Sequence, residues 1–198
     1  MTRPPDAASG AAPGRVPVAN PANALTALRL VLVPVFVGLT VASGMTHNGL
    51  RMLATAVFFV ASLTDFADGW IARTWNLVTS FGKVADPIAD KLLTGTALVL
   101  LSWYDRLPWW VTVVILAREL GVTALRFWVI RHGVIPASRG GKIKTALQIL
   151  AIAWYLWPFP ASVERIGEVI MAAAVVVTVA TGVDYVARAI RLRRSGRA

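Results

Sequence analysis

Six long apolar stretches limit what this chain can fold into more than any other feature of its sequence. A helix that spans a bilayer needs ~20 mostly apolar residues. The six stretches are Leu25–Ser43, Leu50–Ile71, Pro87–Trp103, Pro108–Ile130, Ile143–Trp157 and Val163–Ile190. They are rich in Ala and Leu and lack the strict alternation of barrel strands. The sequence therefore predicts an all-α, polytopic membrane protein with six transmembrane helices.

The rest of the chain is short. Residues 1–20 are rich in Pro, Ala and Gly and predict a disordered tail, residues 21–190 predict one membrane domain, and residues 191–198 predict a basic cytoplasmic tail. At 57% hydrophobic residues, the chain is too apolar for an ordinary soluble domain. It contains no Cys, which excludes disulfides, thiolate nucleophiles and Cys-type zinc sites.

Most of the positively charged residues lie in segments that the six expected spans place on one side of the membrane. The formal net charge is +10, and most bases precede the first span, follow the sixth, or lie between spans two and three and between spans four and five. By the positive-inside rule, both termini and the two basic loops are cytoplasmic. No nucleic-acid motif accompanies these bases, so we expect a membrane-lipid partner and no nucleic acid.

Four aspartates lie where the second expected span ends and the third begins. Asp65 and Asp68 are three residues apart, and Asp86 and Asp90 are four apart, so each pair shares one helix face. A short connection near residues 74–81 makes the two helices antiparallel neighbours, and all four carboxylates can then converge. Carboxylates at membrane depth usually mark function, and this oxygen donor set suits Mg²⁺ or Mn²⁺.

Two roles without a metal are also compatible with these aspartates. One is a structural ion-pair network with Arg73, Lys83 and Lys91. Another is a path for cation transport, although the carboxylates lie at a membrane boundary and not at mid-span.

A phosphate-bearing ligand fits the surroundings of the aspartates, because Gly69, Ala72 and Gly82 leave room beside the backbone and Arg73 offers a guanidinium.

The spacing of these residues resembles a known family signature. The pattern is Asp65-x-x-Asp68-Gly69-x-x-Ala72-Arg73, then eight residues, then Gly82-x-x-x-Asp86-x-x-x-Asp90. It is similar to the signature of the CDP-alcohol phosphatidyltransferases, and the resemblance extends from about Asn20 to the sixth span.

The resemblance implies a fold, a site and a chemistry. It implies a six-helix, commonly dimeric membrane enzyme with a cytoplasmic active site and two divalent cations, Mg²⁺ or Mn²⁺. The metal ligands would be Asp65, Asp68, Asp86 and Asp90, with Asp90 also the catalytic base. The CDP-lipid would contact Gly69, Ala72, Arg73, Gly82, Asn23 and Thr26. The acceptor hydroxyl would attack the lipid phosphate and release CMP in one displacement, with no covalent intermediate on the enzyme.

Three further motifs narrow the choice of acceptor. The stretch Asn20-Pro21-x-Asn23-x-Leu25-Thr26-x-x-Arg29, and those around Arg118-Glu119 and Gly141-Lys142-x-Lys144-Thr145, are similar to a bacterial branch that uses CDP-diacylglycerol and glycerol 3-phosphate. Resemblance to that branch implies that the protein is located in the bacterial inner membrane. A second branch, whose acceptor is phosphatidylglycerol, shares several of these features and is the alternative. A non-enzymatic cation carrier or scaffold is the alternative of a different class.

A cluster of bases supports a phosphorylated acceptor. Arg118 lies inside the fourth span, and Arg139, Lys142 and Lys144 precede the fifth, where they could bind a phosphate dianion. The loop bases could instead serve orientation only, whereas Arg118 within a span needs a partner such as Glu119 or phosphate. On a helix Lys142 and Lys144 point in opposite directions, so only one of them would face the site.

Overall fold

The structure, a computed structural model, describes residues 20–75, 80–129 and 139–195. These ranges contain helices and no strand, which confirms the all-α prediction. The elements are α1 (Pro21–Ser43), α2 (Asn48–Thr74), α3 (Ser80–Trp103), α4 (Trp109–Val129), α5 (Arg139–Leu156), the short helix η1 (Ala161–Val163) and α6 (Glu164–Ser195). Within them, some side chains lie outside the described part, namely those of residues 22, 69, 72, 73, 80–84, 86, 87, 126–129, 139 and 192–195.

Helices α1, α2, α3 and α5 begin earlier than the hydrophobic pattern predicts. Helix α3 starts at Ser80, so Pro87 does not open it, and α5 starts at Arg139 and not at Ile143. Both extensions contain charged residues and glycine, which interrupt the apolar pattern, so hydropathy alone does not detect them. The expected tail over residues 1–20 lies outside the described residues apart from Asn20, and residues 191–195 of the expected basic tail belong to α6.

Local signals account for the ends of α1. The Asn20 side chain accepts a hydrogen bond of 2.9 Å from the backbone N–H of Asn23, and Pro21 follows as the first helical residue. At the other end Gly44 adopts the left-handed conformation with φ of 52°. This tight turn brings α2 back along α1.

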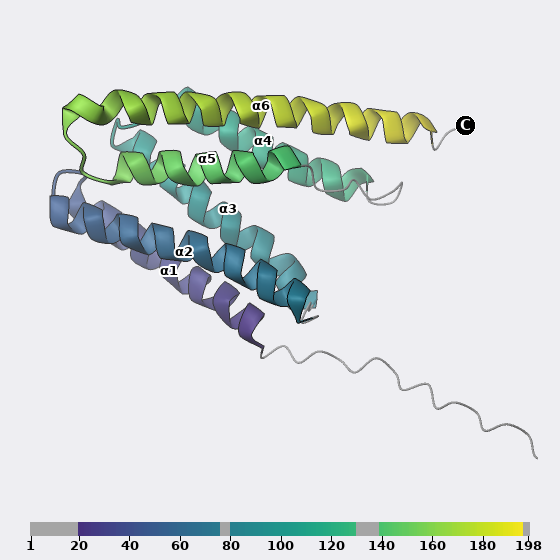
Figure 1. The fold of residues 1–198 in the computed structure, drawn as a ribbon, viewed down its shortest axis with the longest axis horizontal. Helices are drawn as coiled ribbons and strands as arrows, with labels where there is room; N and C mark the ends of the chain where they lie inside the picture. Colours follow the sequence, from purple (N-terminus) through teal and green to yellow (C-terminus); the bar gives the residue numbers. More distant parts are fainter. Residues whose placement is uncertain (1–19, 76–79, 130–138, 196–198) are drawn as a thin grey trace, which may run out of the picture.

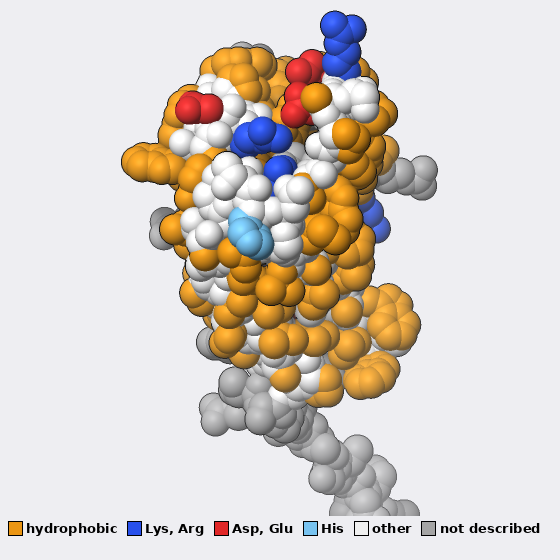
Figure 2. All heavy atoms as spheres, turned by 90° about the vertical axis from the view of Figure 1, so that its left-hand side faces the viewer, with side chains coloured by type: hydrophobic (Ala, Val, Ile, Leu, Met, Phe, Trp, Pro, Cys, Tyr) orange, Lys and Arg blue, Asp and Glu red, His pale blue; other side chains and the backbone are white. Residues whose placement is uncertain are grey.

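The helices run side by side, with both ends of the described chain at the same end of the bundle (Figure 1). Helix α1 packs against α2 and α3, α5 packs against α6 and α2, and α4 packs against α6. The turns between α1 and α2, α3 and α4, and α5 and α6 lie at the opposite end. Figure 2 looks onto that opposite end, where a few charged side chains interrupt a mostly hydrophobic surface.

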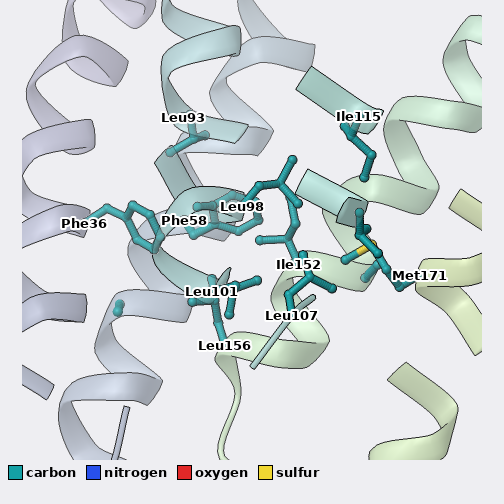
Figure 3. Close-up of a cluster of buried hydrophobic side chains, with 14 of the residues drawn as sticks. Phe36, Phe58, Leu93, Leu98, Leu101, Leu107, Ile115, Ile152, Leu156 and Met171 are labelled. Carbon is teal, nitrogen blue, oxygen red and sulfur yellow. The ribbon is translucent and has the colours of Figure 1, made fainter. Parts of the chain in front are cut away.

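An apolar core at the centre of the bundle joins α1 to α6 (Figure 3). Phe36 of α1 and Phe58 of α2 are fully buried, with ring centroids 5.6 Å apart. Small buried residues, Ala54, Ala97 and Ala151, allow the helices to approach closely. The core packs residues of all six long helices together and so holds their relative register.

The outer surface is that of a membrane protein. Three helices of the described chain are long and apolar enough to cross a bilayer, over Asn23–Ser43, Asn48–Asp68 and Ala161–Arg191. Large apolar side chains such as Val31, Val113 and Val169 are more than half exposed on these and neighbouring helices. Such a surface suits lipid contact. That all six helices cross the membrane stays a prediction.

Candidate active site

A cavity of about 290 Å³ opens among α2, α3, α4, α5 and α6, in the half of the bundle nearer the two chain ends. Its charged lining residues are Asp65, Asp90, Lys91, Arg118, Glu119, Lys142 and Lys144. Carboxylates of α2 and α3 therefore share one cavity with bases of α3, α4 and α5. The size is near the lower limit for small-ligand pockets, ~300–1,000 Å³.

The acidic side of the cavity is organised by Arg29. This α1 side chain is fully buried, and its Nη1 lies 2.8 Å from Asp65 Oδ1. Its Nη2 donates a hydrogen bond to Asp68 Oδ2, to which Thr26 Oγ1 also donates at 3.4 Å. Thr26 and Arg29 are three residues apart on α1, as Asp65 and Asp68 are on α2, so two polar faces meet between the helices.

The other two aspartates of the motif lie on α3. Asp90 is half-buried and lines the cavity together with Asp65. Asp86 lies one turn earlier on the same helix, and its side chain is outside the described part. Helices α2 and α3 are in contact, which places the two halves of the motif on neighbouring helices.

The acidic side fits a hard divalent cation by its chemistry. Asp65 and Asp68 present carboxylate oxygens around a single buried positive charge, that of Arg29, so this point of the structure already holds a cation. Among the residues that the structure describes, no group of three or more metal-ligating side chains is found. Asp86, which the motif adds to this set of ligands, has its side chain outside the described part, so its role as a ligand stays a prediction.

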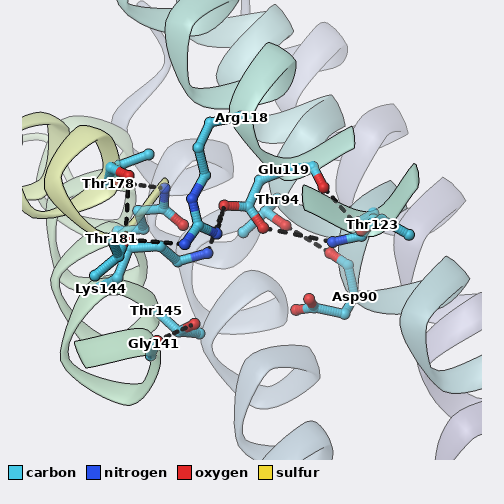
Figure 4. A network of polar contacts seen from close by, with 12 residues as sticks. Asp90, Thr94, Arg118, Glu119, Thr123, Gly141, Lys144, Thr145, Thr178 and Thr181 are labelled. Atoms are coloured by element: carbon cyan, nitrogen blue, oxygen red, sulfur yellow. Dashed lines mark hydrogen bonds and ion pairs between the residues drawn. The ribbon is translucent and has the colours of Figure 1, made fainter. Parts of the chain in front are cut away.

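The basic side of the cavity is built around Glu119 of α4 (Figure 4). Its Oε1 accepts hydrogen bonds from Lys144 at 2.5 Å and from Arg118 at 3.0 Å, and its Oε2 accepts one from Lys91 at 3.4 Å. Three helices thus bring their cations to one carboxylate. Because each ammonium and guanidinium carries further N–H donors, this arrangement leaves donors for a ligand.

The predicted acceptor residues do not all lie together. Lys144 is buried on Glu119, while Lys142, two residues away on α5, is exposed at the edge of the cavity. Arg118 is mostly buried, and its Nε has no hydrogen-bond partner among the described residues. The side chain of Arg139 lies outside the described part.

Of the residues predicted to contact the CDP-lipid, some have described surroundings and others do not. Thr26 reaches Asp68, and Asn23, one turn earlier on α1, is also buried. Four further candidates, Gly69, Ala72, Arg73 and Gly82, belong to α2 and α3, but their side-chain surroundings are outside the described part. Their assignment to the CDP-lipid stays a prediction.

Sequence reasoning assigns no site role to Arg29 or Lys91, and treats Glu119 only as a neighbour of Arg118. In the sequence, Arg29 stands out only as the last residue of the motif that begins at Asn20, yet it is fully buried against two aspartates. The ion-pair alternative places Lys91 beside the aspartates, whereas it bonds Glu119 of α4. A charged residue within an apolar span needs a partner, so the position of Arg29 inside the first span is the available signal.

A larger cavity of about 370 Å³ lies at the opposite end of the bundle. It is lined by aromatic side chains, including Trp110, Trp154 and Trp157. Arg106, which supplies positive charge to this lining, is 3.6 Å from Glu164. Among the residues that the structure describes, this lining lacks the combination of carboxylates and several bases that marks the smaller cavity.

Comparisons with known proteins relate the whole helical part of the chain to one family. Residues 19–180 match the CDP-alcohol phosphatidyltransferase family. A Mycobacterium tuberculosis H37Rv protein named "probable phosphatidylglycerophosphate synthase" is 53% identical over 183 residues, which are 92% of this chain and 88% of that protein. Proteins of Bacillus subtilis and Rickettsia felis, each named CDP-diacylglycerol–glycerol-3-phosphate 3-phosphatidyltransferase, are 38% and 39% identical, over 84% of this chain and 93% of each relative. The chain belongs to the CDP-alcohol phosphatidyltransferase family.

Proposed function

We propose that the protein transfers the phosphatidyl group of CDP-diacylglycerol to glycerol 3-phosphate, giving phosphatidylglycerophosphate and CMP. The relatives' names supply the reaction, and family membership supplies the transferase class. One structural observation carries the proposal: carboxylates suited to the donor's cations and bases suited to the acceptor's phosphate line the same cavity.

The donor end of the cavity is the side formed by Asp65 of α2 and Asp90 of α3, behind which Arg29 of α1 is buried. Asp65, Asp68, Asp86 and Asp90 would hold two divalent cations, which when bound would neutralise the diphosphate and the departing CMP. Arg29 keeps Asp65 and Asp68 in place from α1 and shares their negative charge. The remaining donor contacts that we propose are Gly69, Ala72, Arg73, Gly82, Asn23 and Thr26.

Asp90 is the proposed base. It lines the cavity, and in Figure 4 its carboxylate points across toward the part of α5 that carries Gly141 and Thr145. The acceptor hydroxyl oxygen would form a bond to the lipid-bearing phosphorus while the bond from that phosphorus to the CMP oxygen breaks. Asp90 would take the hydroxyl proton. One in-line displacement of this kind needs no nucleophile from the enzyme.

The basic side of the cavity suits a phosphate dianion. Lys91, Arg118 and Lys144 bring three positive charges to the single negative charge of Glu119, a formal balance of +2. A terminal phosphate of glycerol 3-phosphate carries close to two negative charges near neutral pH. Charge-assisted bonds from Arg118 and Lys144, with Lys142 at the edge of the cavity, would bind this phosphate and leave the acceptor's hydroxyl toward Asp90. Arg139, the first residue of α5, is the fourth base that we propose for the acceptor.

The location and assembly that we propose follow from the charge pattern and the family. The cavity lies in the half of the bundle nearer the two chain ends, where Arg188 and Arg191 extend α6. By the positive-inside rule this end faces the cytoplasm, in the inner membrane of a bacterium, where glycerol 3-phosphate is available. We expect a homodimer, since the family is commonly dimeric.

An acceptor panel tests the proposal. Purified protein in detergent is given CDP-diacylglycerol and Mg²⁺ with glycerol 3-phosphate, phosphatidylglycerol, inositol phosphate or serine, and CMP and lipid products are measured. We expect glycerol 3-phosphate to give phosphatidylglycerophosphate at the highest kcat/KM. Preference for phosphatidylglycerol, with cardiolipin as the product, would refute the assignment, and no CMP release with any acceptor would favour a non-enzymatic role.

A further inference from the structure

Helix α6 and helix α4 together hold the guanidinium of Arg118. Arg118 Nη2 donates a hydrogen bond of 2.9 Å to Thr181 Oγ1 of α6, while Nη1 donates to Glu119 at 3.0 Å (Figure 4). The ring centroid of Tyr185, one turn after Thr181, lies 6.0 Å from Arg118 Cζ. With both terminal nitrogens restrained, the guanidinium has one defined orientation beside the cavity.

The Thr181 hydroxyl is fixed as an acceptor toward Arg118. Its proton is directed to the carbonyl oxygen of Val177, 2.7 Å away in the preceding turn, with Thr178 O at 3.1 Å. A hydroxyl has one proton and two lone pairs, so the oxygen presents a lone pair to Arg118. Thr181 therefore does more than fill space, because its oxygen sets where Nη2 lies.

Gly182 gives Arg118 the room to lie against α6. A Cβ added at Gly182 would lie 3.0 Å from Arg118 Cγ and 3.6 Å from Nε. The first distance is closer than ordinary contact, so Arg118 would have to move by a few tenths of an ångström. At the second distance, the added methyl group would shield Arg118 Nε, a buried donor that has no hydrogen-bond partner among the described residues. By contrast, a Cβ added at Gly121 of α4 would meet nothing within 4 Å.

We propose that Thr181, Gly182 and Tyr185 form a positioning element of α6 that fixes Arg118 for the phosphate of a phosphorylated alcohol. This inference rests on the proposed function, since it deepens the acceptor site named there. Tyr185 lines the cavity, whereas Thr181 and Gly182 are not among its described lining residues and need not touch the substrate. The effect of Thr181 and Gly182 passes through the direction of Arg118, and so it falls on acceptor binding and not on the donor.

Two substitutions with matched controls test the positioning role. Thr181→Val keeps the shape and removes the lone pair, whereas Thr181→Ser keeps the hydroxyl. Gly182→Ala adds the crowding methyl, and Gly121→Ala adds a methyl in open space. For each purified variant, KM for glycerol 3-phosphate, KM for CDP-diacylglycerol, kcat and the melting temperature in detergent are measured.

The expected pattern is specific to the acceptor. Thr181→Val and Gly182→Ala should raise KM for glycerol 3-phosphate about three- to tenfold, the size of one weakened hydrogen bond to a charged group. KM for CDP-diacylglycerol should stay within experimental error, and Thr181→Ser and Gly121→Ala should behave as the wild type. If Gly182→Ala does not fold, the Thr181→Val and Thr181→Ser pair decides.

The outcomes separate this inference from the proposed function. If the wild-type protein uses glycerol 3-phosphate but Thr181→Val and Thr181→Ser give the same acceptor KM, the positioning role is wrong and the function stands. Equal rises in both KM values would also overturn it, since they would indicate a general structural effect. If the wild type uses another acceptor lacking a terminal phosphate, both the function and the inference fail.

Discussion

Replacing Arg29 by Met removes the cation that the structure places between Asp65 and Asp68. The side chain of Asp68 is only 4% exposed and that of Asp65 is 32% exposed, so water compensates the first carboxylate little. Met retains a long, unbranched side chain, and the substitution therefore removes charge with little loss of volume. The expected result is a large loss of stability in the absence of divalent cations.

The magnitude follows from the burial of the pair. Removing one partner of a buried ion pair costs ~3–5 kcal/mol, because the remaining charge stays desolvated. For a chain of this size, ~1 kcal/mol lowers the melting temperature by roughly 2–4 °C, so we expect a decrease of about 6–20 °C. The matched control is Arg106→Met, because the Arg106–Glu164 pair spans 3.6 Å and both side chains are at least one-third exposed. An exposed pair contributes ~0–1 kcal/mol, and the control should lose no more than about 4 °C.

The assay is thermal unfolding in detergent, first with EDTA and then with saturating Mg²⁺. With Arg29 absent, a divalent cation can supply the charge that the carboxylates have lost, so Mg²⁺ should raise the melting temperature of Arg29→Met by more than that of the wild type. If Arg29→Met and Arg106→Met lose the same stability in EDTA, the buried network is not the structural element that we describe. If Mg²⁺ stabilises the wild type and Arg29→Met equally, the guanidinium and the metal do not compete for these carboxylates.

Three further predictions concern the base, the acceptor side and the topology. Asp90→Asn should lower kcat by about 10²–10⁴-fold and leave KM for glycerol 3-phosphate nearly unchanged, as measured by steady-state kinetics. Gel filtration of the variant checks that the loss of activity does not come from misfolding. Glu119→Gln should lower the melting temperature, because Lys144, Arg118 and Lys91 lose their shared carboxylate. Added inorganic phosphate should stabilise this variant more than the wild type, and equal phosphate effects would contradict the proposed cation cluster. Reporter fusions at residue 198 should be cytoplasmic and fusions near Asn48 external, and the reverse result would place the active site on the wrong face.

Hydropathy and spacing predict the helices well and the contacts between them poorly. The order of the helices and the pairing of Asp65 with Asp68 on one face follow from periodicities within one segment. The bond from Arg29 to Asp68 joins residues 39 positions apart. It depends on how α1 and α2 register against each other, which the shared packing of Phe36 and Phe58 determines.

The basic side of the cavity shows the same limit. The sequence places Arg118 and Glu119 next to each other, but only packing reveals that Lys91 and Lys144 reach Glu119 from α3 and α5. Helical geometry does predict that Lys142 and Lys144 point apart, and the structure buries Lys144 and exposes Lys142. The contribution of α6 through Thr181 and Gly182 has no signal in the sequence, because Thr and Gly are common in membrane helices.

The most direct test of the central claim is the stoichiometry of one reaction. Purified protein is incubated with CDP-diacylglycerol and glycerol 3-phosphate, and CMP and lipid products are quantified together by chromatography and mass spectrometry. We predict one phosphatidylglycerophosphate for each CMP, formation that stops in excess EDTA and returns with Mg²⁺, and no CMP release above background without glycerol 3-phosphate. Undiminished product formation in excess EDTA, or CMP release that does not depend on glycerol 3-phosphate, would contradict the account.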